Sequence, residues 1–140
     1  SEAVNQVIAM SKQAGARRAI LLNVSAPFHC SLMQPAAERL ARDLAEVGFE
    51  DPRVPVVCNV TATSIATGAA ARLALEQQVT QPVLWSETLE FLSAQGVEVF
   101  VEVGPGRVLS GLVKRTLGRG VEIYAVDEIE EIEAVLAALG

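Results

Sequence analysis

Residues 97–117 read VEVFVEVGPGRVLSGLVKRTL and hold the clearest strand, turn and helix of the chain. Residues 97–103 alternate apolar and acidic side chains, and their apolar centre is typical of a mostly buried strand. Gly104, Pro105 and Gly106 then predict a tight turn into a helix. A phosphate-cradling turn is the other interpretation, but the chain has neither GxxxxGK(S/T) nor GxGxxG. The apolar positions of the helix recur at helical spacing: Val108, Leu109, Leu112, Val113 and Leu117.

The same alternation of strand and helix continues on both sides of this stretch. Apolar runs predict further strands over residues 19–24, 55–60 and 121–126. Helical periodicity predicts helices over 3–14, from Ser31 up to Gly48, over 70–78, from Ser86 up to Gly96, and from Asp127 onward. Ser31 with Gln34, and Asp127 with Glu130, have the spacing of capping boxes. Residues 61–69 are rich in small and hydroxyl side chains and predict a loop.

Strands that return through helices predict an α/β fold with a largely parallel sheet. The chain has 140 residues, the size of one ordinary domain. It opens directly into a helix and strand, without a first strand–helix unit before them. We therefore expect it to be the later part of a longer protein.

Composition excludes several classes of function. Hydrophobic residues make up 51% of the chain, enough for a sizeable core, yet no apolar run is long enough to span a bilayer. A net charge of −6 and 4% aromatic residues argue against nucleic-acid binding. Cys30, Cys58 and the single histidine are too few for a zinc site. Sparse cysteine and no recognisable leader predict a cytoplasmic protein. From the few possible ligands and the short apolar runs we expect no metal and no membrane partner.

His29 is the residue best suited to chemistry. It lies in the segment Ser25–Cys30, between a predicted strand and a predicted helix, at the kind of edge where open α/β sheets bind ligands. Imidazole titrates near neutral pH, so His29 could act as a general base; a capping or surface histidine is the alternative. The chain contains no GxSxG, so no serine nucleophile elbow is expected within it.

Four stretches, in order and spacing, resemble the family of malonyl-CoA:acyl carrier protein transacylases, which includes the acyltransferase domains of polyketide and fatty-acid synthases. The stretches are Val24–Met33, Pro55–Val60, Gln78–Trp85 and Glu102–Arg115. The resemblance implies that residues 25–140 form the later part of an α/β-hydrolase-like large subdomain. It implies that residues 1–24 form the end of a ferredoxin-like small subdomain.

The resemblance also implies a ping-pong reaction without a cofactor. A serine in GHSxG takes the malonyl group from malonyl-CoA, and the phosphopantetheine thiol of acyl carrier protein then receives it. His29 matches the base for both attacks, and Gln78 matches the position whose backbone carbonyl orients the imidazole. Phe28 matches a position that selects malonyl over methylmalonyl units, although ordinary core packing is the alternative.

The serine and the carboxylate-binding arginine of the family lie in motifs that these residues do not contain, and Arg107 and Arg115 do not match that arginine. We therefore expect the 140 residues alone to be inactive, and to self-associate or to need a missing N-terminal segment. Three alternatives stay open: a non-catalytic fragment, a carrier-protein binding module, and an acyltransferase segment of a polyketide synthase.

Overall fold

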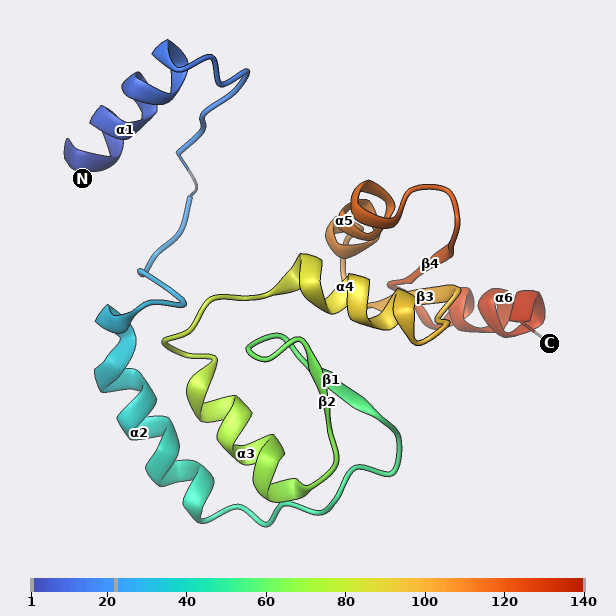
Figure 1. Cartoon of the computed structure of the whole chain (residues 1–140). Helices are drawn as coiled ribbons and strands as arrows, with labels where there is room; N and C mark the ends of the chain where they lie inside the picture. The colour runs from blue at the N-terminus through green and yellow to red at the C-terminus, as the bar shows by residue number, and fades with distance from the viewer. Residues whose placement is uncertain (1, 22, 140) are drawn as a thin grey trace.

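A computed structural model describes residues 2–21 and 23–139 as an α/β protein. Figure 1 shows its helices and strands in chain order. The helices are α1 (Glu2–Gln13), the short 3-10 helix η1 (Ser31–Met33), α2 (Gln34–Ala45), α3 (Gly68–Gln77), α4 (Trp85–Ala94), α5 (Val108–Leu117) and α6 (Ile129–Leu139). The strands are β1 (Val56–Cys58), β2 (Thr63–Ile65), β3 (Val99–Val103) and β4 (Glu122–Val126).

The strand, turn and helix predicted over 97–117 are present as β3 and α5. The chain returns through α5 to β4, which pairs with β3 in parallel, as expected for this part of the chain. Helix α5 packs on both strands, α4 packs on α5, and α6 packs on β4. Leu89 and Val113, from α4 and α5, are the most deeply buried side chains of this layer.

The prediction of a largely parallel sheet is wrong for the other half of the chain. Within the described residues there are two separate two-stranded sheets. The strand predicted over 55–60 is present as β1, but it pairs antiparallel with β2, which lies in the region 61–69 expected to be a loop. The hairpin turn places Ala62 at φ 52°, and the N–H of Ala62 donates to the carbonyl of Cys58 over 2.8 Å. Alanine is rare in this left-handed conformation, so the sequence carries no recognisable turn signal there.

Helices α2 and α3 pack side by side in opposite directions (Figure 1). The hollow between them is lined by Gln34 and Ala37 from the first turns of α2 and by Gln77 from the last turn of α3. Ala37 and Ala74 are the buried side chains of this pair. Because the helices are antiparallel, the loop that precedes α2 lies at the end of α3.

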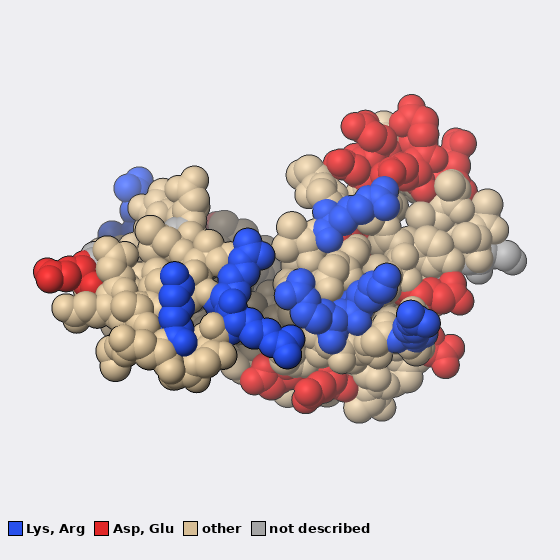
Figure 2. All heavy atoms as spheres, turned by 90° about the horizontal axis from the view of Figure 1, so that it is seen from above, with Lys and Arg blue, Asp and Glu red and all other residues tan. Residues whose placement is uncertain are grey.

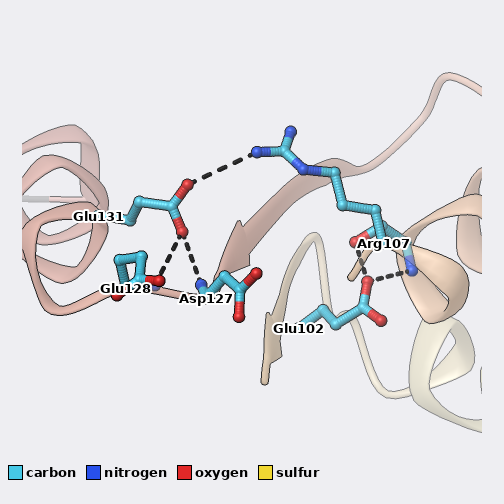
Figure 3. A network of polar contacts seen from close by, with 6 residues as sticks. Glu102, Arg107, Asp127, Glu128 and Glu131 are labelled. Carbon is cyan, nitrogen blue, oxygen red and sulfur yellow. Dashed lines mark hydrogen bonds and ion pairs between the residues drawn. The ribbon is translucent and has the colours of Figure 1, made fainter. Parts of the chain in front are cut away.

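Two predicted helix starts differ from the structure. The residues before η1 and α2 provide no side-chain cap, so Ser31 is not the N-cap that its spacing with Gln34 predicts. At α6, the backbone N–H of Asp127 donates to the carboxylate of Glu131 over 2.6 Å, so Glu131 has the role predicted for Glu130 (Figure 3). The helix begins at Ile129, later than the capping box predicts, so the acidic residue that accepts from the backbone also lies later, at Glu131.

The strand predicted over 19–24 is not present at the described residues of that segment; Leu22 lies outside them. Ile20, Leu21 and Val24 are all exposed. A β-strand exists only where a neighbour satisfies its backbone N–H and C=O groups, and no described segment pairs with these residues. Figure 1 shows α1 at the far end of this extended segment, apart from the other helices.

The chain exposes far more surface than a compact domain does. Its accessible area is 10537 Å², whereas a folded monomer of this mass exposes about 7000 Å². The most exposed large apolar side chains include Val103 on β3, Ile129 on α6 and Leu32 on η1. Exposed apolar side chains in this number favour association with another segment or chain.

None of the described helices combines the length and the apolar character needed to cross a membrane.

Candidate functional site

His29 occupies a backbone conformation that few side chains adopt. Its φ is 58°, in the left-handed region, which costs free energy for any residue with a Cβ atom. Two local hydrogen bonds hold the surrounding loop: the N–H of Phe28 donates to the carbonyl of Ala26 over 3.0 Å, and the Sγ of Cys30 donates to the carbonyl of Pro27 over 3.1 Å. Such constrained backbone is common at functional sites, because it fixes the direction of a side chain.

The structure brings His29 and Gln78 together, although 49 positions separate them in the sequence. The Nδ1 atom of the imidazole lies 2.8 Å from the backbone carbonyl oxygen of Gln78. A carbonyl oxygen can only accept a hydrogen bond, so Nδ1 carries a proton, and in the neutral imidazole Nε2 then keeps its lone pair. The side chain is exposed, and this arrangement leaves Nε2 free to take a proton from a substrate or a nucleophile.

The acceptor for His29 belongs to the end of a helix. Gln78 is the C-terminal cap residue of α3, with φ −61° and ψ −20°. The last carbonyl groups of a helix have no partner within it and lie at the negative end of the helix dipole. The α3 terminus therefore offers the imidazole both an acceptor and a favourable field.

Phe28 lies beside His29 and does not belong to the core of this chain. Its side chain is 55% exposed. Ordinary core packing within the described residues is therefore excluded, and the ring is available to contact a ligand or another segment. The role of Phe28 in selecting the acyl group stays a prediction.

The glycine turn after β3 is a tight turn, as the sequence predicts. The N-terminus of α5, which follows the turn, already binds an anion, the carboxylate of Glu102. Oxygen atoms of the Glu102 carboxylate accept from the N–H of Leu109 over 2.9 Å and from the N–H of Ser110 over 2.8 Å. The hydroxyl of Ser110 donates to the same carboxylate over 2.5 Å. Because Glu102 fills the position that a phosphate would take at the start of α5, the phosphate-cradling interpretation is disfavoured.

Sequence reasoning missed this role of Glu102. The sequence did carry a signal for it. Glu102 lies on the same face of the strand as Phe100, and the helix residue whose backbone N–H it accepts, Leu109, follows seven residues later. An acid on the half-buried face of a strand needs hydrogen-bond donors, and the N-terminus of the next helix supplies them.

Acidification is expected to weaken the folded chain through Glu102. Hydrogen bonds from the hydroxyl and the backbone N–H of Ser110 lower the pKa of the Glu102 carboxyl. Its stabilising contribution is therefore present above the unfolded-state pKa, about 4.3, and is lost as the pH falls through the lower folded-state pKa. Urea unfolding between pH 7 and pH 3 should show a shallower loss of stability for Glu102→Gln than for the unchanged chain. Equal pH dependence in both would contradict this assignment.

A second polar network joins the start of α5 to the start of α6 (Figure 3). One oxygen of Glu131 lies 3.6 Å from the Arg107 guanidinium, and the other accepts the N–H groups of Asp127 and Glu128. These backbone N–H groups lower the pKa of Glu131, and Arg107 contributes less. The Arg107 side chain is 74% exposed, so the ion pair contributes little to stability.

A basic hollow of about 670 Å³ lies over α5 and the start of β4. Arg107, Lys114 and Arg119 line it, together with Ser110 and small residues of the helix end. Figure 2 shows Lys and Arg side chains across one face of the molecule, although the chain as a whole is acidic. Among the described residues, no three histidine, cysteine or acidic side chains gather as they would around a metal ion.

Known proteins resemble this chain over nearly its full length. The malonyl CoA-acyl carrier protein transacylase of Salmonella typhimurium is 48% identical over 138 residues, which is 99% of this chain and 43% of that protein. The chain is a relative of the malonyl-CoA:acyl carrier protein transacylases. It spans less than half the length of the curated transacylases that it matches. No protein-family model matches the sequence.

Solved transacylase structures share the fold. The transacylase of Coxiella burnetii matches with a TM-score of 0.91 and 42% identity, over 99% of this chain and 44% of that one. A malonyl transacylase solved with its type II polyketide synthase acyl carrier protein matches with a TM-score of 0.91 and 43% identity, over 99% of this chain and 44% of that one. These matches confirm the resemblance inferred from the four sequence stretches.

Proposed function

We propose that this chain supplies the histidine part of a transacylase that moves a malonyl group from malonyl-CoA to the phosphopantetheine thiol of acyl carrier protein. The contact between Nδ1 of His29 and the Gln78 carbonyl is the observation that carries the proposal. It prepares Nε2 as a base, which is the role that the resemblance to the transacylases implies. The transacylase relatives, at 48% identity or less, support this choice of reaction.

The proposed reaction has two halves, and His29 moves one proton in each. In the first, Nε2 takes the proton of a serine hydroxyl as the serine oxygen attacks the malonyl thioester, and then gives it to the departing thiolate of CoA. In the second, Nε2 takes the proton of the phosphopantetheine thiol, whose sulfur attacks the malonyl ester, and returns it to the serine oxygen. The Gln78 carbonyl stabilises the imidazolium formed in each half. No cofactor is needed.

We propose that the serine belongs to a segment outside these 140 residues, because they contain no GxSxG. We propose that residues 25–140 complete an α/β-hydrolase-like large subdomain with that missing part, and that residues 1–24 end a ferredoxin-like small subdomain. The exposed apolar surface and the unpaired backbone of the described residues in segment 19–24 support this division. The two free cysteines support a reducing, cytoplasmic setting.

Phe28→Ser is expected to relax the choice of acyl group. An aromatic ring beside the α-carbon of the malonyl group leaves little room for an α-methyl group, and serine is much smaller. One methyl group in an apolar pocket is worth roughly 1–3 kcal/mol, so the methylmalonyl-to-malonyl ratio of kcat/KM should rise about tenfold to a few hundredfold. Competition between the two thioesters in the complete polypeptide measures this ratio. An unchanged ratio would show that the ring contacts something else.

The pathway has a second candidate. One matching structure is a malonyl transacylase in complex with a type II polyketide synthase acyl carrier protein, at 43% identity. Transfer to a polyketide carrier protein therefore competes with fatty-acid synthesis as the setting of the same reaction. Comparing kcat/KM for carrier proteins of the two kinds decides between them.

The test of the proposed function is a label-transfer assay. A polypeptide that continues this chain through a GHSxG serine is incubated with radiolabelled malonyl-CoA and phosphopantetheinylated carrier protein. Label on the carrier protein above the rate without enzyme supports the proposal. Label that never leaves CoA, with a folded polypeptide, would overturn it and favour a non-catalytic binding module.

A further inference from the structure

Helix α3 is held at its first residue by the loop that follows α2. The backbone N–H of Gly68 donates to the carboxylate of Asp51 over 2.9 Å. Gly68 is buried, and a Cβ atom there would lie 2.6 Å from the carbonyl carbon of Phe49 and 2.8 Å from the carbonyl oxygen of Glu50. The backbone of residues 49–51 therefore lies directly against the start of α3, at a distance that only glycine permits.

The other end of the same helix holds the imidazole. The Gln78 carbonyl that accepts from Nδ1 of His29 belongs to the C-terminal cap of α3. An α-helix of ten residues is a stiff rod of about 15 Å, so a displacement at Gly68 carries through to Gln78. Helices α2 and α3 pack antiparallel (Figure 1). The loop before α2, which carries His29, therefore lies at the C-terminal end of α3, and the loop after α2, which carries Asp51, lies at its N-terminal end.

We propose that Gly68 and Asp51 are positioning residues for His29, acting through α3. They set the axial position of the helix, and the helix sets where the Gln78 carbonyl meets Nδ1. This inference rests on the proposed role of His29 as base, and it names the part of the fold that selects the tautomer. Neither residue contacts the imidazole; each acts about 15 Å away, at the opposite end of α3.

His29 is the only histidine of the chain, so its tautomer can be measured without ambiguity. The chain is labelled with ¹⁵N-histidine, and magic-angle-spinning NMR at alkaline pH distinguishes a protonated Nδ1 from a protonated Nε2 whatever the size of the assembly. In the unchanged chain we expect the Nδ1–H form to dominate. Dominance of the Nε2–H form would overturn the inference at once.

Two substitutions test the positioning role of Gly68 and Asp51. Gly68→Ala forces α3 away from residues 49–51, and Asp51→Ala removes the acceptor of the Gly68 N–H. Each should lower the ratio of the Nδ1–H to the Nε2–H form by about fivefold, the ratio that a typical net hydrogen-bond energy gives. An unchanged ratio in the folded Asp51→Ala chain would overturn the inference, including in the case where Gly68→Ala does not fold.

Matched variants separate positioning from general destabilisation. Gly48→Ala adds the same methyl group where nothing lies within 4 Å, and should keep the ratio of the unchanged chain. Asp51→Asn keeps a side-chain oxygen as acceptor and should restore the ratio that Asp51→Ala loses. A loss in Gly48→Ala or in Asp51→Asn equal to that of the test variants would contradict positioning.

The NMR result and the label-transfer assay fail independently. A normal tautomer response with no transfer of label to carrier protein would sink the proposed function and leave the positioning role standing. Transfer of label with no tautomer response would overturn the positioning role of Gly68 and Asp51 and leave the proposed function standing.

Discussion

Replacing His29 by alanine in the complete polypeptide is expected to slow malonyl transfer by a factor of about 10² to 10⁴, the usual consequence of losing a general base. In the proposed reaction the imidazole moves a proton in both halves, so the loss should affect formation of the malonyl-enzyme adduct as well as its transfer to carrier protein. Rapid-quench measurement of each half-reaction with radiolabelled malonyl-CoA checks this. Folding should change little, because His29 is exposed.

Ser31→Ala is the matched control for this substitution. Ser31 is an exposed polar residue two positions further along, at the start of η1, and it lies outside the proposed machinery. It should transfer malonyl at the rate of the unchanged polypeptide. Near-normal transfer by the folded His29→Ala variant would show that the base is another residue and would remove the central assignment.

The 140 residues alone are expected to transfer no malonyl group at all. A base without its nucleophile cannot form the acyl-enzyme, and the remaining serines lie outside any nucleophile elbow and lack oxyanion donors. The mass-verified chain is incubated with radiolabelled malonyl-CoA and carrier protein. A malonyl adduct on the chain, or labelled carrier protein above the rate without enzyme, would contradict this expectation.

The same preparation tests the exposed surface. An accessible area of 10537 Å² on a chain of this size predicts that isolated chains associate. Light scattering should therefore report oligomers or aggregates, whereas the longer polypeptide should remain of one defined size. A stable monomer of the isolated chain would show that the apolar surface is tolerated in water.

The sequence predicted the elements that carry their own signals. Residues 97–117 combine a buried strand pattern, a glycine turn and helical periodicity, and the structure has β3 and α5 there. Segment 19–24 has equal apolar character but no described pairing partner, so its strand prediction is wrong within this chain. The strand over 55–60 was predicted and is present as β1, but β2 and its hairpin with β1 were missed because the turn uses Ala62 in place of glycine or asparagine. Local pattern predicts an element well only where its neighbours are also present.

The sequence predicted the residues of the candidate site but not all of the contacts between them. His29 was apparent from its place between a strand-like segment and a helix, and residue 78 came from the family resemblance. Long-range contacts such as the one between His29 and Gln78 depend on how α2 and α3 pack, which periodicity does not specify. The capping role of Glu102 was missed because a carboxylate reaching a helix seven residues later has no short motif.

The partner of the imidazole is a main-chain atom, and this has a consequence for genetics. No substitution at residue 78 removes a backbone carbonyl, so a saturation screen for activity should find that many side chains are accepted there. The same screen should find His29 intolerant to change. Such a screen would identify only the serine and the histidine, although the proposed mechanism has a third member, the Gln78 carbonyl, that no codon change removes. Ester or thioamide replacement of the peptide group after Gln78, made by chemical ligation, is the way to expose it.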